Sequence, residues 1–239
     1  MKRYKQQIQL PEIGEKGQQK ISQASVLVVG AGGLGTVVAT YLVAMGVGKI
    51  GIVDFDTIEE SNLHRQFLYS SNDLGKSKAL VLTSKLKNQN EHLTICAFDE
   101  ELTSSNFDEI IKNYSIVCDC TDNLNTRLII DKKSFANEIP LVHGAVSDWQ
   151  GYITLLQYKN KFRYQDLFDI KTLLQADSCE SKGISSPVCG IIGSLMSNEV
   201  VKIILGIASN LDGGLLYVNG LTNNLKFLKL KRSSTKFRL

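Results

Sequence analysis

Paired cysteines are what this sequence most clearly lacks. It has five cysteines and no Cys-x-x-Cys pair: Cys96, Cys118, Cys120, Cys179 and Cys189. An odd set without close pairs excludes a disulfide framework of the kind that small secreted proteins use. We therefore expect a reducing, cytoplasmic compartment.

A dense basic face and an apolar leader are also missing. The 27 Lys and Arg residues exceed the 24 acidic residues by a net charge of only +3, and the excess lies mostly near the two ends. We expect no nucleic-acid partner from so small an excess. The first ten residues alternate in charge, so no signal peptide is expected. Residues 24–48 are uncharged, but their glycines divide them into a strand and a helix, and we expect no membrane span.

What is present is an alternation of apolar strand-like and helix-like segments from residue 26 to residue 144. We expect strands at 26–29, 50–53, 93–98, 116–120 and 140–144, and helices at 34–45, 76–88, 104–113 and 125–137. Strands and helices that alternate at this length predict an α/β fold with a Rossmann-like, mostly parallel sheet and helices on both faces.

The alternation ends near residue 150. We expect a strand at 151–158, an irregular polar crossover at 159–186, a helix at 189–205 and a closing antiparallel pair at 215–218 and 225–230. The 239 residues are expected to form one domain. Its parts would be an N-terminal helical arm over 1–24, a nucleotide-binding part over 25–150 and an antiparallel extension over 151–239.

A glycine-rich turn, Gly30-x-Gly32-x-x-Gly35, follows the first expected strand and opens a helix. Glycine permits the tight turn and lets the backbone approach a phosphate, which then lies against the helix N-terminus. Asp54, at the end of the next strand, can bind ribose hydroxyls. NAD, FAD and ATP users share these features, so an oxidoreductase stays open at this point.

Charged side chains beyond the turn favour ATP. Arg65 and Lys78 offer cationic charge, and Asp122 offers a carboxylate for a metal ion at the carboxyl edge of the sheet. ATP carries about twice the negative charge of a dinucleotide pyrophosphate and is usually bound with a divalent metal. The ordinary alternatives are a surface salt bridge for Arg65, a solvated helix start for Lys78 and a helix N-cap for Asp122.

Ordered motifs from residue 3 to about residue 230 carry a specific resemblance. They include Gly30-Ala31-Gly32-Gly33-Leu34-Gly35, Asp54-Phe55-Asp56, Ser61-Asn62-Leu63-His64-Arg65-Gln66, Gly75-Lys76-Ser77-Lys78, Cys118-Asp119-Cys120-Thr121-Asp122-Asn123 and Gly190-Ile191-Ile192-Gly193-Ser194. On these motifs the chain resembles the ThiF/MoeB/HesA family, the bacterial relatives of ubiquitin-activating enzymes.

The resemblance implies a homodimeric adenylyltransferase that uses ATP and Mg²⁺. Such an enzyme activates the C-terminal glycine of a small ubiquitin-like sulfur carrier ending in Gly-Gly, and it releases pyrophosphate. A sulfur donor such as a cysteine desulfurase would be a further partner. The pathway would be thiamin biosynthesis, which we slightly favour, or molybdopterin biosynthesis.

The resemblance also assigns roles. It places Asp54 on ribose, Arg65 and Lys78 on the phosphates, and Asp122 on magnesium as the metal ligand. The expected catalytic residues are Arg65, Lys78, Asp122 and Cys179, the last matching a family cysteine that can link to the carrier. The expected nucleotide-binding residues are Gly32, Gly33, Asp54, Asp56, Asn62, Arg65, Gln66, Lys78, Asp122 and Asn123.

The chain departs from the family pattern in two places. Family members often hold zinc with two Cys-x-x-Cys pairs, which are missing here, so no structural zinc is expected. Gln6, beside Lys5, stands where the family usually has an arginine that reaches ATP across the dimer. Three alternatives therefore stay open: an adenylating enzyme that modifies a peptide, a NAD-dependent oxidoreductase, and a scaffold that binds nucleotide without turnover.

Overall fold

A computed structural model describes residues 2–170, 173 and 183–230. One sheet of eight strands runs through the protein in the order β3-β2-β1-β4-β5-β6-β7-β8. Its strands are β1 (Ser25–Val29), β2 (Lys49–Val53), β3 (Thr94–Phe98), β4 (Ile116–Asp119), β5 (Leu141–Ser147), β6 (Gln150–Leu156), β7 (Gly214–Asn219) and β8 (Asn224–Lys229). The pairs from β3 to β5 are parallel, and those from β5 to β8 are antiparallel. The predicted fold class is confirmed.

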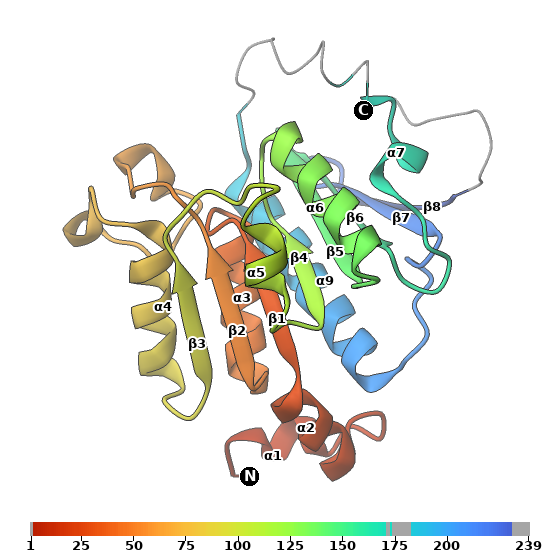
Figure 1. The fold of residues 1–239 in the computed structure, drawn as a ribbon, viewed down its shortest axis with the longest axis horizontal. Helices are drawn as coiled ribbons and strands as arrows, with labels where there is room; N and C mark the ends of the chain where they lie inside the picture. The colour runs from red at the N-terminus through yellow and green to blue at the C-terminus, as the bar shows by residue number, and fades with distance from the viewer. Residues whose placement is uncertain (1, 171–172, 174–182, 231–239) are drawn as a thin grey trace.

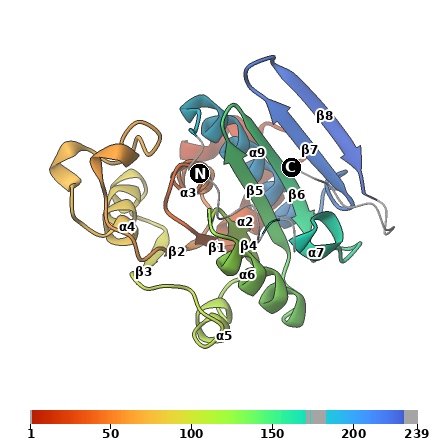
Figure 2. The same cartoon turned by 90° about the horizontal axis from the view of Figure 1, so that it is seen from above.

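Helices cover both faces of this sheet (Figures 1 and 2). The described helices are α1 (Lys5–Ile8), α2 (Gly14–Gln23), α3 (Gly35–Met45), α4 (Lys78–Gln89), α5 (Phe107–Ile111), α6 (Leu124–Ala136), α7 (Tyr164–Leu167) and α9 (Ser186–Leu205), with short 3₁₀ turns η1 (Lys2–Tyr4), η2 (Glu60–Asn62) and η3 (Ser71–Asp73). One apolar core joins the sheet to α3, α4 and α9, and a second joins it to α5, α6 and α7. Because both faces are covered, the parallel strands are mostly apolar, as their sequences predict.

The segment between β6 and β7 holds more regular structure than the sequence suggested. The short helix α7 lies inside the stretch expected to be irregular, and α9 begins at Ser186, three residues before the expected start. α9 is long and apolar enough to cross a membrane by length and composition alone, but half of that stretch is buried within the protein. α9 packs beside α3 and against β5 and β6, as a core helix of this sheet does.

The glycine turn packs against the end of β4. Gly30 has φ +93°, a conformation that favours glycine, and a Cβ added there would lie 2.8 Å from the carbonyl oxygen of Cys120. Since β1 leads on to β2 on one side and β4 to β5 on the other, the strand order reverses between β1 and β4. A crevice at the carboxyl ends of the two strands at such a point is where this class of sheet binds ligands.

Candidate active site

A cavity of about 480 Å³ lies at this point of the sheet. Every residue expected to contact nucleotide lines it: Gly32, Gly33, Asp54, Asp56, Asn62, Arg65, Gln66, Lys78, Asp122 and Asn123. Of the four expected catalytic residues, Arg65, Lys78 and Asp122 lie here, whereas Cys179 falls outside the described residues. Motifs far apart in sequence, from Gly30 to Asn123, are thus brought to one opening.

Asp54 joins the end of β2 to the glycine turn. Its carboxylate accepts hydrogen bonds from the backbone N–H of Ala31 at 2.6 Å and of Asp56 at 2.8 Å. Burial raises the pKa of Asp54, although the two backbone N–H groups and the charge of Lys78 oppose that rise. Each carboxylate oxygen keeps a lone pair for a further donor, which suits a partner with two adjacent hydroxyl groups such as ribose.

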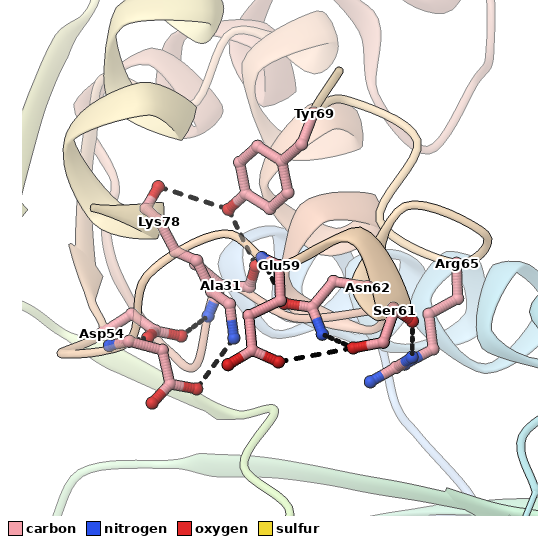
Figure 3. A network of polar contacts seen from close by, with 9 residues as sticks. Ala31, Asp54, Glu59, Ser61, Asn62, Arg65, Tyr69 and Lys78 are labelled. Atoms are coloured by element: carbon pink, nitrogen blue, oxygen red, sulfur yellow. Dashed lines mark hydrogen bonds and ion pairs between the residues drawn. The ribbon is translucent and has the colours of Figure 1, made fainter. Parts of the chain in front are cut away.

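Tyr69 is a support that the sequence alone did not reveal. Its buried hydroxyl donates to the carbonyl oxygen of Ala31 at 2.8 Å and lies 3.2 Å from that of Lys78, as Figure 3 shows. This side chain therefore ties the glycine turn to the first turn of α4. The long stretch between the two motifs offered no reason to single it out.

Lys78 is buried, with its ammonium group 2.7 Å from the Asp56 carboxylate, which is half-exposed. The solvated helix start considered for Lys78 is therefore not what the structure contains. A buried ammonium with one exposed carboxylate partner is poised to exchange that partner for a phosphate.

Arg65 follows η2 on the same side of the cavity. Its guanidinium donates to the carbonyl oxygen of Ser61 at 3.0 Å, as Figure 3 shows. It also lies 3.0 Å from Nε2 of His64. Neither partner is a carboxylate, so these contacts do not neutralise the cation. It is free to compensate an anionic ligand.

Asp122 lies in the turn after β4, and its neighbour Asn123 takes the capping role. The Asn123 side-chain oxygen accepts from the backbone N–H of Thr126 at 2.8 Å and so begins α6. The N-cap considered for Asp122 is thus wrong. The Asp122 side chain is exposed at the cavity and makes no hydrogen bond to another described residue.

The fit of Asp122 to a metal ion depends on what kind of site is required. Across the described residues, no group of three or more His, Cys, Asp or Glu side chains is placed to hold a metal. Mg²⁺ that arrives with a nucleotide needs no such group, because phosphates and waters complete its shell around one or two carboxylates. An exposed, uncommitted carboxylate in the same cavity lining as Arg65 and Lys78 fits that arrangement.

Two cysteines at the cavity are poor nucleophiles. Cys120 and Cys189 both line it. Burial raises the pKa of Cys120 well above that of an ordinary thiol, and burial also raises the pKa of Cys189 despite the opposing charge of Arg65. Thiols held neutral react slowly, so both act as parts of the wall.

The cavity also has lining residues that sequence reasoning missed. They include Glu100 and Glu101 after β3, Arg127 on α6, and Ala145 and Val146 on β5. Arg127 donates to the carbonyl oxygen of Thr121 at 2.7 Å from Nη2 and 3.2 Å from Nε. Its position one turn into α6, four residues after the Asn123 cap, was the available signal.

Residues 4–238 match the ThiF family. The chain belongs to the ThiF family. The expected relationship is therefore confirmed over nearly the whole sequence. The match covers the glycine turn, the η2 segment, the start of α4 and the turn after β4, so these walls of the cavity all lie within the matched residues.

Relatives of this ThiF-family chain carry names of adenylating enzymes. It is 38% identical over 237 residues to a sulfur carrier protein adenylyltransferase of Thermus thermophilus, covering 97% of this chain and 88% of that protein. It is 40% identical to a probable molybdopterin-synthase adenylyltransferase of Porphyra purpurea, covering 98% of this chain and 62% of that protein. The chain spans between one half and two thirds of several other curated relatives that it matches.

Among solved structures, E. coli MccB with ATP has a TM-score of 0.81 to this chain at 21% identity. The alignment covers 92% of this chain and 67% of that protein. At this identity the likeness establishes the shared fold: a Rossmann-like sheet with an antiparallel extension.

Proposed function

We propose that this protein activates a carboxylate as an acyl-adenylate at the expense of ATP. The single observation that carries the proposal is the cavity at the end of β1 and β4. It combines a glycine turn for phosphate, the cations Arg65 and Lys78, and the uncommitted carboxylate of Asp122. A redox enzyme that binds a pyrophosphate needs less positive charge than this.

The chemistry suits these side chains. A substrate carboxylate oxygen attacks the α-phosphorus of ATP, the bond to the bridging oxygen of the β-phosphate breaks, and pyrophosphate leaves with the electron pair. The attacking group is already ionised, so no general base is needed, and the barrier is dominated by repulsion between anions. Arg65 and Lys78 lower that barrier by neutralising phosphate charge and aligning the groups. Mg²⁺, held at Asp122, would add charge neutralisation when bound.

The proposed substrate is the C-terminal glycine of a ubiquitin-like sulfur carrier. The name of the Thermus thermophilus relative supports this class of partner. A homodimer, a cysteine desulfurase as sulfur donor, a cytoplasmic location and a sulfur relay through Cys179 belong to the same proposal. The preference for thiamin over molybdopterin stays a prediction, and the name of the Porphyra purpurea relative points to the second pathway.

Exchange of radiolabelled pyrophosphate into ATP tests the proposal. We expect exchange that depends on a carrier ending in Gly-Gly, and a loss of about 100-fold or more in Arg65→Ala and in Asp122→Ala. Lys112→Ala is the matched control, because it removes a cation of an exposed ion pair at the end of α5. Cys179→Ser is expected to leave exchange intact while blocking sulfur transfer.

The other outcomes separate the alternatives. Exchange with a short peptide instead of a carrier would indicate a peptide-modifying enzyme. Binding of NADH without ATP would indicate an oxidoreductase, and tight ATP binding without exchange would indicate a scaffold. Unchanged exchange in Arg65→Ala or Asp122→Ala would remove that residue from the mechanism.

A further inference from the structure

Behind the cavity wall lies a buried polar cluster that the proposed chemistry does not use. Asp119, the last residue of β4, and His143, on β5, are 1% and 0% exposed. They are register partners on adjacent parallel strands, and Nδ1 of His143 lies 2.8 Å from the Asp119 carboxylate. Burying such a pair costs free energy and adds little net stability, so stability alone does not explain its presence.

The other oxygen of Asp119 holds Thr121. It accepts from the Thr121 backbone N–H at 3.0 Å and from the Thr121 hydroxyl at 2.7 Å. The Thr121 carbonyl oxygen in turn accepts from Arg127. Every polar group of Thr121 is thus bound, and Thr121 directly precedes Asp122.

The cluster closes into a ring. Nε2 of His143 lies 3.0 Å from the hydroxyl of Tyr152 on β6. Tyr164, in α7, is within hydrogen-bonding reach of both Tyr152 and Arg127. Its aromatic ring packs edge-on against the imidazole of His143, with 5.1 Å between the two ring centroids. Five elements, β4, β5, β6, α6 and α7, therefore contribute side chains to this cluster at the base of a single turn.

Attraction and hydrogen bonding hold Asp119 as a carboxylate. Burial alone raises the pKa of Asp119, but the charges of His143 and Arg127 and the hydrogen bonds from His143 and Thr121 outweigh it, and the net pKa is lowered. A buried carboxylate of this kind accepts hydrogen bonds strongly, which makes it an effective anchor for the Thr121 backbone.

We infer that Asp119 and His143 are positioning residues that fix the turn carrying Asp122 toward Mg²⁺ and ATP. The inference rests on the proposed function for the role of Asp122. The physical reason is that Asp122 has no hydrogen bond of its own to a described residue, so its direction depends on the backbone on either side. Asn123 holds one side through the α6 cap, and the ring holds the other.

The test compares His143→Ala, His143→Asn and Asp119→Asn in the full chain. In His143→Asn the side-chain amide N–H can replace Nδ1 as the donor to Asp119, so this variant is expected to restore what alanine removes. Glu199→Gln is the matched control: Glu199 is a buried carboxylate paired with Lys202 on α9, outside the cavity.

Two readouts go beyond the rate. Amide hydrogen exchange without nucleotide is expected to be faster over residues 119–124 in His143→Ala and Asp119→Asn, and near wild type in His143→Asn and Glu199→Gln. Calorimetry is expected to show that the gain in ATP affinity on adding Mg²⁺ is about tenfold smaller in His143→Ala and Asp119→Asn than in wild type. The ATP affinity measured in EDTA should be unchanged.

The outcomes distinguish the two levels of inference. Wild-type protein that neither binds ATP nor exchanges pyrophosphate overturns the proposed function, while the hydrogen-exchange result still decides whether the ring holds the turn. If wild type is active and His143→Ala and Asp119→Asn lose only stability, the positioning role is overturned. In that case the hydrogen-exchange protection of the turn and the Mg²⁺ dependence of ATP binding would be unchanged.

Discussion

Within the glycine turn, Gly35 has no room for a side chain. A Cβ added to Gly35 would lie 1.8 Å from the carbonyl oxygen of Gly30, well inside van der Waals contact. The hydrogen of glycine is what lets the turn close and α3 begin directly behind it. The phosphate-binding role of the turn depends on that closure, because backbone N–H groups must face the ligand.

Gly35→Ala is therefore expected to lower the free energy of unfolding by about 3 kcal/mol or more, since backbone atoms would have to move apart. Gly190→Ala is the matched control: it also lies in a helix, but an added Cβ meets nothing within 4 Å. There alanine is expected to stabilise by about 0.5–1 kcal/mol through its better helix propensity. Urea unfolding measures both, and similar values for the two variants would contradict this account of the turn.

At the scale of elements, side chains outside the cavity lining join η3 to α4. Asp73, which ends η3, accepts from the Ser70 backbone N–H at 2.9 Å and from the Ser70 hydroxyl at 2.8 Å, and it is paired with Lys85 on α4. Lys85 also donates to the carbonyl oxygen of Leu68 at 2.6 Å. This contact ties the loop after the Arg65 segment to the helix that begins at Lys78.

Asp73 should give the stability of this junction a defined pH dependence. Hydrogen bonds from Lys85 and Ser70 lower the pKa of Asp73 from 3.8 to about 2. A folded pKa below the unfolded value means that the stabilisation is fully present above about pH 4 and is lost as pH falls toward 2. Asp73→Asn is expected to cost about 1 kcal/mol at neutral pH, less than the whole shift implies, because Lys85 is 32% exposed and solvent screens the pair.

The measurement is urea unfolding of wild type and Asp73→Asn at several pH values between 7 and 3. The difference between their free energies of unfolding should stay constant down to about pH 4 and then become smaller as the pH falls further. Lys85→Met, which removes the partner, should show the same narrowing. A difference that grows on acidification would mean that Asp73 is not the stabilising carboxylate.

At the scale of the whole molecule, ligand binding and folding are linked through the cavity. Its walls come from the glycine turn, the η2 segment, the start of α4, and the turn after β4. A ligand that contacts all of them stabilises the complete sheet edge, which no single element could form. Binding to the folded state alone raises the unfolding free energy in proportion to the logarithm of ligand concentration.

ATP with Mg²⁺ at about 100 times its dissociation constant is expected to stabilise the protein by about 2.7 kcal/mol. For a chain of this length that is a rise in Tm of roughly 5–10 °C. Differential scanning fluorimetry measures it. Arg65→Ala and Asp122→Ala should lose most of the rise, whereas Lys112→Ala should keep it. A rise with NADH and none with ATP would favour the oxidoreductase instead.

The sequence by itself determined the parallel sheet, the glycine turn and ten of the residues that line the cavity. Apolar strand segments, turn glycines and charged motifs after strands are local signals, and parallel strands in this fold bring their carboxyl ends to one edge. Asp54, Arg65, Lys78 and Asp122 could therefore be placed together from the order of these signals along the chain.

Only the tertiary structure decided which partner each of these side chains has. That Asn123 rather than Asp122 caps α6, and that Lys78 is buried against Asp56, depends on packing between segments far apart in sequence. The ring from Asp119 through His143 to Tyr164 depends on the register of adjacent strands and on where α7 lies, and no local pattern encodes those contacts. The partners of a side chain are set only when distant segments pack together. For that reason the motifs alone could not predict them.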